Sequence, residues 1–305
     1  MSKEKYASYV DLMLKILPHV ALEKCFSLKG GTAINLFVRN MPRMSVDIDL
    51  AYVGLEPRDS AIKNAENALS RIKSEIEKQV PKTKVLRPTK SDDDNISKLI
   101  AVSNGVQIKI EANPVIRGTV FESAERDLVE NAEKQFKVAM SVPVVSIPDL
   151  YGGKIVAALD RQHPRDLFDI KLLIENEGLN PQIINGFLVY LSSHKRPINE
   201  VLTPTKKNML NTFTDEFMGM TNIKFTYEDF EKTRDLLILE INSRLTNEQR
   251  EYLVTLQEGF PNWQLLGLNG VSELPAVKWK LENIQKMDSK KRLEAVDNLK
   301  RSLKL

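Results

Sequence analysis

The spacing of hydrophobic residues changes near residue 146, and this change limits what the chain can fold into. Before residue 146, short alternating runs typical of strands are interleaved with helical patterns, whereas nearly all later patterns are helical. The length of 305 residues suits one large domain or two of ordinary size. We therefore predict an α/β domain over residues 1–145 and a helical domain over residues 146–305.

The expected elements follow from these patterns and from the residues that break them. Helical patterns cover residues 7–25, 32–38 and 57–79, and Thr32 is expected to cap the second of them. Strand patterns cover 26–28, 43–53, 85–88, 96–102 and 106–111, with a polar turn at 91–95 and an Asn104-Gly105 hairpin turn. Later helices are expected over 147–159, 163–177, 228–245, 247–258, 279–287 and 289–303.

The composition indicates an ordinary soluble globular protein, with 42% hydrophobic and 28% charged residues. No apolar run approaches the roughly 20 residues of a membrane span, and the first residues do not resemble a signal peptide. Cys25 is the single cysteine, so no disulfide can form within the chain, and the scattered histidines argue against a His-rich zinc site. We expect a cytoplasmic protein that does not bind membranes.

The segment Ser45-Val46-Asp47-Ile48-Asp49 contains the first candidate catalytic residues. In a strand, alternate side chains share one face, so Ser45, Asp47 and Asp49 would stand together. Two adjacent carboxylates repel each other unless a cation lies between them, and oxygen ligands suit Mg²⁺ or Mn²⁺. Taken alone, the motif also fits an edge strand with a solvated acidic face.

Glu111 is a third candidate carboxylate. It lies on the polar face of the predicted strand 106–111, where apolar and polar residues alternate. If that strand neighbours the one with Asp47 and Asp49, the three carboxylates would suit two-metal phosphoryl transfer. Ordinary amphipathic alternation is the other explanation for Glu111.

The turn Lys29-Gly30-Gly31-Thr32 is a candidate phosphate-binding turn. Two glycines let the backbone approach a phosphate, and the N–H groups of a following helix can bind it. The Walker pattern is absent, so the turn is not a P-loop. By itself a Gly-Gly-Thr sequence is common in turns.

The predicted helical domain contributes a second group of candidates. Lys154 and Arg161 are seven residues apart and therefore share one helix face. Gly152 and Gly153 weaken a helix, so we expect another backbone or a ligand to come close to them.

The next predicted helix carries two carboxylates. Pro164 suits the first turn of this helix and places Asp166 near its N-terminus. As structural residues, Asp166 would interact with the helix dipole and Asp169 would pair with Arg165.

The C-terminal twenty residues form a basic tail, with seven Lys or Arg against three acidic residues between Lys286 and Leu305. A basic helix suits a polyanionic partner such as RNA, and it also suits a solvated surface.

Together these motifs resemble the AbiEii/AbiGii toxin family of bacterial nucleotidyltransferases, which is related to the DNA polymerase β type of fold. The resemblance is carried in chain order by Lys29–Ala33, Arg43-x-Ser45-x-Asp47-x-Asp49, Glu111 and Lys154-x₆-Arg161-x₃-Arg165-Asp166-x₂-Asp169. The segment Leu274–Leu281 also looks like the family's C-terminal region. The resemblance implies an α/β nucleotidyltransferase domain with a mixed sheet, and an all-helical domain that contributes Lys154 and Asp169 to the cleft.

The resemblance also implies roles for the candidate residues. Catalysis would depend on Asp47, Asp49, Lys154 and Asp169, and the metal ion would be held by Asp47, Asp49 and Glu111. Nucleotide binding would involve Lys29, Gly30, Gly31, Thr32, Ser45, Arg161 and Asp166. The expected cofactor is Mg²⁺ or Mn²⁺, and the expected substrate is a nucleoside triphosphate (NTP).

The resulting hypothesis is a toxin that transfers a nucleoside monophosphate from an NTP to an RNA 3′ end and so blocks translation. The expected acceptor is tRNA, the expected partner is a cognate antitoxin of a toxin–antitoxin or phage-defence system, and the protein is expected to be a monomer. One alternative is an enzyme of the same fold that nucleotidylates a protein hydroxyl. Another is an inactive protein that binds nucleic acid or a partner.

Overall fold

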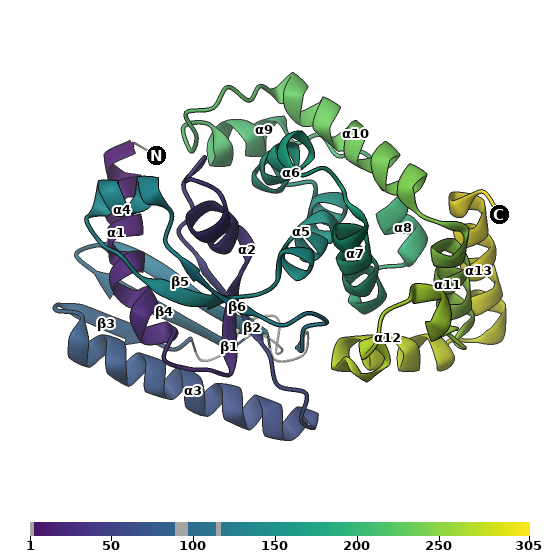
Figure 1. The fold of residues 1–305 in the computed structure, drawn as a ribbon, viewed down its shortest axis with the longest axis horizontal. Helices are drawn as coiled ribbons and strands as arrows, with labels where there is room; N and C mark the ends of the chain where they lie inside the picture. Colours follow the sequence, from purple (N-terminus) through teal and green to yellow (C-terminus); the bar gives the residue numbers. More distant parts are fainter. Residues whose placement is uncertain (1–2, 89–96, 114–116) are drawn as a thin grey trace. The chain divides into compact units, whose positions relative to one another are not determined.

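The structure, a computed structural model, describes residues 3–88, 97–113 and 117–305. It divides into two compact units, which are drawn in one ribbon in Figure 1. The first unit comprises Met1–Ser146 and Met218–Lys224, and the second comprises Ile147–Phe217 and Phe225–Leu305. The short segment Met218–Lys224 therefore returns to the first unit from a part of the chain that otherwise belongs to the second.

The first unit is built on a mixed sheet with the strand order β3-β4-β5-β2-β1-β7-β6. Its strands are β1 (Phe26–Lys29), β2 (Ile48–Tyr52), β3 (Thr83–Leu86), β4 (Ser97–Ser103), β5 (Val106–Asn113), β6 (Ala124–Asp127) and β7 (Ser141–Val144). The pairs β2–β5 and β1–β7 are parallel, and the other pairs are antiparallel. The hairpin between β4 and β5 turns at Asn104-Gly105, where both residues have positive φ, as the sequence predicts.

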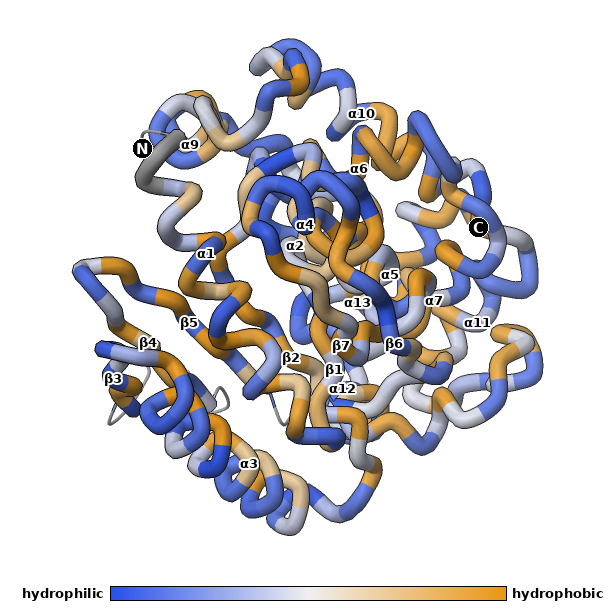
Figure 2. Tube along the Cα trace, turned by 60° about the vertical axis from the view of Figure 1, so that its left-hand side comes forward, coloured by the Kyte–Doolittle hydropathy of each residue, from blue (hydrophilic) through white to orange (hydrophobic). Residues whose placement is uncertain are grey.

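The helices of the first unit are α1 (Lys3–Val20), α2 (Gly30–Ala33), α3 (Arg58–Gln79) and α4 (Glu130–Phe136), and a π-helical turn, Ile34–Val38, continues α2. Hydrophobic and hydrophilic residues alternate along α3 in Figure 2, as expected for a helix with one face on the sheet. The buried positions of α3 include Ala65, Leu69, Ile72 and Ile76, which are spaced three or four residues apart.

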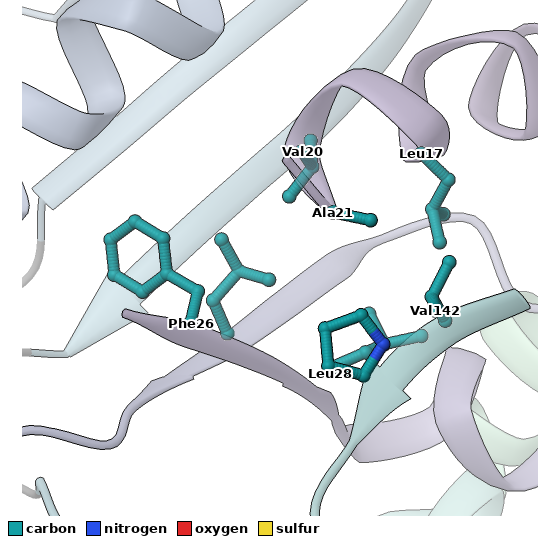
Figure 3. Close-up of a pocket in the computed structure, with 8 residues that line it drawn as sticks. Leu17, Val20, Ala21, Phe26, Leu28 and Val142 are labelled. Atoms are coloured by element: carbon teal, nitrogen blue, oxygen red, sulfur yellow. The ribbon is translucent and has the colours of Figure 1, made fainter. Parts of the chain in front are cut away.

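Side chains from the end of α1 and from β1, β2 and β7 meet around a small apolar cavity of about 10 Å³ (Figure 3). Leu17 and Val20 approach it from the helix, and Phe26, Leu28 and Val142 approach it from the sheet. This dense apolar packing fixes β1, which leads directly into the Gly30-Gly31 turn.

The second unit is helical throughout its regular structure. Its helices are α5 (Ile147–Arg161), α6 (Pro164–Asn176), α7 (Pro181–Ser193), α8 (Ile198–Leu202), α9 (Leu210–Thr212), α10 (Tyr227–Arg244), α11 (Asn247–Glu258), α12 (Pro275–Gln285) and α13 (Ser289–Leu303). A π-helical turn, Phe213–Phe217, and two 3₁₀ turns, Trp263–Leu266 and Val271–Glu273, complete it.

Two glycines allow α5 and α7 to pack backbone against backbone. A Cβ atom at Gly152 would lie 2.4 Å from the carbonyl carbon of Gly186, and one at Gly186 would lie 2.1 Å from the carbonyl oxygen of Pro148. The predicted close approach at Gly152 is thus confirmed, and the approaching group is another helix.

Most predicted elements are present, but several boundaries differ. The strand predicted over 43–53 begins only at Ile48, because Arg43 instead forms an isolated bridge with Thr221 of the returning segment. The helix predicted from Thr32 begins at Gly30, and Lys29 stands at its N-cap without a side-chain bond, so the predicted Thr32 cap is wrong. The predicted turn at 91–95 lies outside the described residues.

The sequence patterns did not indicate β6, α4, β7 or the return of Met218–Lys224 to the first unit. Within the described ranges, none of the helices combines the length and the hydropathy that a membrane crossing requires.

Candidate active site

The carboxylate of Asp49 lies directly over the backbone of Gly30. Gly30 has φ +74°, and a Cβ atom there would be 2.4 Å from Asp49 Oδ2. Both the left-handed conformation and the lack of space therefore require glycine at this position. The structure thus brings the predicted phosphate-binding turn and one predicted metal ligand together.

Gly31 faces a different pair of side chains. A Cβ atom at Gly31 would lie 2.7 Å from Arg43 Nη2 and 3.0 Å from Ser45 Oγ. Arg43 is buried, and its Nη1 donates a hydrogen bond to the carbonyl oxygen of Met44 at 2.9 Å. A guanidinium and a hydroxyl at a glycine turn are groups that donate hydrogen bonds to phosphate oxygens. The sequence motif contained Arg43, but spacing alone gave it no role.

Thr32 holds the segment that carries Asp47. Its buried hydroxyl donates to the carbonyl oxygen of Asp47 at 2.5 Å and lies 3.0 Å from Ser45 Oγ. Asp47 precedes β2 by one residue, and Asp49 is the second residue of that strand. Thr32 therefore positions Asp47 and Ser45 through the main chain and one hydroxyl contact.

Lys29 is the residue opposite Asp49 in the antiparallel pairing of β1 with β2. Residues paired in this way have neighbouring side chains. Burial lowers the pKa of Lys29 below the ordinary lysine value, and the Asp49 carboxylate opposes part of that change. Lys29 thus places an amine beside the Asp49 carboxylate.

Glu111 occupies the predicted neighbouring strand, and its register is directly opposite Asp49 in the parallel pair β2–β5. Its side chain forms an ion pair with Lys98 of β4, with Oε1 2.7 Å from Nζ. In the parts of the chain that the structure describes, no three His, Cys, Asp or Glu side chains gather in a way that could hold a metal ion.

The fit to a divalent cation therefore depends on Asp47 and Asp49. Both residues are half-buried, and the Asp49 carboxylate lies beside Gly30 of the glycine turn. Mg²⁺ is commonly bound through one or two carboxylates together with substrate phosphates, so two protein carboxylates satisfy its usual requirements. The role of Glu111 as a metal ligand stays a prediction.

The candidates of the second unit form a buried ionic cluster. Lys154 Nζ lies 3.0 Å from Asp166 Oδ1 and 3.1 Å from Asp169 Oδ2. Arg161 binds the same Asp166 through Nε at 2.5 Å and Nη2 at 2.9 Å. The predicted shared face of Lys154 and Arg161 is confirmed, because both reach one carboxylate. Asp169 pairs with Lys154, and the nearest ion-pair partner of Arg165 is Glu216 at 3.9 Å.

The cluster is fixed by the corner between α5 and α6. The ring of His163 caps α6 by accepting a hydrogen bond from the Arg165 backbone N–H. Phe168 anchors the same helix against Phe217 and Phe225, with ring centroids 5.4 Å away in each case.

The electrostatics of the cluster favour an ionised Asp166. Burial alone would raise the pKa of Asp166, but the charges of Lys154 and Arg161 outweigh it and hold this pKa well below the ordinary value. The Arg161 side chain is 63% exposed, whereas the Lys154 side chain is 5% exposed. Arg161 is therefore the cation of this cluster that solvent, or an anion, reaches most readily.

The sequence matches the family model for the AbiEii nucleotidyl transferase toxin of type IV toxin–antitoxin systems over residues 11–283. The chain belongs to this family. The match covers most of the chain and includes the Gly30-Gly31 turn, the Asp47 and Asp49 pair and the Lys154 cluster. The protein is accordingly a nucleotidyltransferase toxin of a toxin–antitoxin system.

A solved structure supports the fold. The chain is similar to MenT4, a nucleotidyltransferase toxin from Mycobacterium tuberculosis H37Rv, with a TM-score of 0.62 and 12% sequence identity. The similarity covers 92% of this chain and 93% of that one. At this level of identity the likeness concerns the fold alone. No curated protein matches the sequence.

Proposed function

We propose that this nucleotidyltransferase moves a nucleoside monophosphate from an NTP to the 3′ end of an RNA, with tRNA as the expected acceptor, and thereby blocks translation. The observation that carries the proposal is the contact between the Asp49 carboxylate and the backbone of Gly30, with Arg43 and Ser45 at Gly31. This arrangement combines a cation-binding carboxylate with a turn that can hold phosphate, as transfer from a triphosphate requires.

The residues of the first unit would bind and orient the triphosphate. Ser45 and Arg43, whose side chains face Gly31, would donate hydrogen bonds to its phosphate oxygens. Asp47 and Asp49 would hold Mg²⁺ or Mn²⁺, which when bound polarises the phosphoryl group and offsets the charge that develops there. Thr32 would keep Asp47 and Ser45 in place.

The residues of the second unit are proposed to act in the same reaction. Arg161 and Lys154 would contact the triphosphate, and Asp169 would assist the attacking hydroxyl or the metal ion. Asp166 would orient both cations, since it binds Lys154 and Arg161 at once. The basic tail would contact the RNA backbone through the cations of α13.

The acceptor can be identified by incubating the protein with each α-³²P-labelled NTP, total RNA and a protein extract. The proposal expects label on RNA, at a 3′ end, and not on protein. Label on protein would instead support nucleotidylation of a protein hydroxyl. Label on neither would support a protein that only binds nucleic acid or a partner. Since the family belongs to toxin–antitoxin systems, the neighbouring antitoxin gene should relieve growth arrest when it is co-expressed.

A further inference from the structure

The first unit contains a pocket of about 340 Å³ whose lining includes Arg43, the residue that faces Gly31 of the candidate phosphate-binding turn. It lies between the loop that leads to Ser45 and the returning segment Met218–Lys224, and Ala7 of α1 and Gln135 of α4 complete it. Its volume falls within the range of about 300–1,000 Å³ that is usual for small-molecule sites.

Hydrogen bonds fix the two walls of the pocket against each other. The Met44 N–H donates to the carbonyl oxygen of Met220 at 2.9 Å, and Thr221 Oγ1 donates to the carbonyl oxygen of Pro42 at 2.7 Å. Arg43 and Thr221 also form a β-bridge. The walls are therefore built structure and not a gap between mobile loops.

Met41 adopts an unusual backbone conformation in this loop. It has φ 54°, which is uncommon for a residue other than glycine. The Met41 N–H donates to the carbonyl oxygen of Asn35 at 3.0 Å, and this bond helps to hold the strained position. Strained positions of this kind gather at ligand-binding sites, where the surrounding structure maintains them.

The lining has the chemistry of a site for a flat heteroaromatic ring. Three methionines, Met41, Met44 and Met220, supply polarisable apolar walls, and thioethers make favourable contacts with aromatic rings. Gln135 and Asn222 bring two exposed amides whose side chains form no hydrogen bond within the described parts of the chain. Amides of this type can pair with the hydrogen-bonding edges of a base.

Arg43 connects this pocket to the phosphate-binding turn. It is the one charged residue among those that line the pocket, and its Nη2 is the atom that a Cβ at Gly31 would meet. A molecule that fills the pocket would therefore extend toward Arg43, and phosphates at that end would lie near Gly31. A nucleotide has this layout, with an uncharged ring at one end and an anionic chain at the other.

We propose that this pocket binds a nucleobase. The inference deepens the proposed function, on which it rests, by assigning the base of a nucleotide to Met41, Met44, Met220, Gln135 and Asn222. Either the incoming NTP or the terminal nucleotide of the acceptor RNA can supply that base.

The test uses the full-length protein labelled with ¹³C at its methionine methyl groups, nine in the chain. Methyl resonances are assigned with single Met→Leu variants, and spectra are recorded with NTP, inorganic tripolyphosphate or a short RNA. A base in the pocket should give ring-current shifts at Met41, Met44 and Met220. Tripolyphosphate should not produce them, and Met287, which lies in the second unit, should not respond.

A double variant, Gln135→Ala with Asn222→Ala, gives a second readout. Losing two hydrogen bonds of about 0.7 kcal/mol each, in the lower half of the usual range, corresponds to a loss of roughly tenfold in affinity for the nucleotide. Tripolyphosphate binding should not change, and Gln107→Ala, at an exposed position of β5, serves as the matched control.

The two possible sources of the base give different results. Shifts and a tenfold loss with NTP assign the pocket to the incoming nucleotide, and the same response with RNA alone assigns it to the acceptor. No methionine shift with either ligand, or an unchanged affinity in the double variant, overturns the proposal. Both readouts measure ligand binding and do not depend on turnover. A negative result in the transfer assay therefore does not count against nucleobase binding in this pocket.

Discussion

Replacing Lys154 by methionine should destabilise the second unit strongly. The Lys154 side chain is 5% exposed and lies between Asp166 and Asp169, which are 2% and 0% exposed. The substitution keeps the length of the side chain but removes its charge, so Asp169 loses this buried partner while Asp166 retains Arg161. Removing one partner of a buried ion pair lowers the free energy of unfolding by about 3–5 kcal/mol.

Thermal unfolding followed by circular dichroism measures this effect. One kcal/mol shifts the midpoint by about 2–4 °C in a domain of this size, so about 3–5 kcal/mol predicts a fall of roughly 6–20 °C. Adding Asp169→Asn to the same chain removes the carboxylate that has lost Lys154 as its partner, and should recover part of the loss. A fall of less than about 2 °C for Lys154→Met, or a double variant no more stable than the single one, would refute the reasoning.

Three further predictions concern the turn, the ionic cluster and the tail. Gly30→Ala should abolish transfer, because its Cβ would meet Asp49 Oδ2 at 2.4 Å. The control Gly105→Ala, also at positive φ but with open space around it, should lower stability and leave transfer intact. A radiolabel assay of transfer by both variants decides this. The pKa of Asp166 is lower in the folded protein than in the unfolded chain, so its stabilising effect is present above about pH 3.9 and is lost as the pH falls further. Acid titration of Asp166→Asn should show a smaller loss of stability below pH 4 than the wild type, and an identical loss would contradict this assignment. For RNA binding, the logarithm of the affinity should fall linearly with the logarithm of the salt concentration. In the triple variant Lys290→Gln, Lys291→Gln and Arg292→Gln, the slope should become smaller by about one for each phosphate-contacting cation removed. An unchanged slope in this variant would leave the tail as a solvated surface.

The sequence predicts the elements that carry the candidate residues because local patterns specify them. The alternation of Val106–Glu111 and the Asn104-Gly105 turn give β5, and the pairing of β5 with β2 places Glu111 opposite Asp49 as expected. Pro164 marks the start of α6, as its fixed φ suits a first helical turn.

The remaining features depend on contacts between residues far apart in the chain. The bridge between Arg43 and Thr221 shortens the predicted strand, and nothing near residue 43 indicates a partner 178 positions later. The ion pair between Glu111 and Lys98 depends on the register of β4 with β5. Spacing put Lys154 and Arg161 on one face, but only the turn into α6 makes Asp166 their common partner.

The central claim is nucleotidyl transfer that depends on Asp47 and Asp49. The most direct measurement compares the wild-type protein with the Asp47→Asn and Asp49→Asn double variant, both supplied with α-³²P NTP, RNA and Mg²⁺. The account predicts a labelled RNA 3′ end and released pyrophosphate for the wild type, and neither for the double variant, whose circular dichroism should show that it stays folded. Equal labelling by both proteins, or full labelling by the wild type in excess EDTA, would contradict the account.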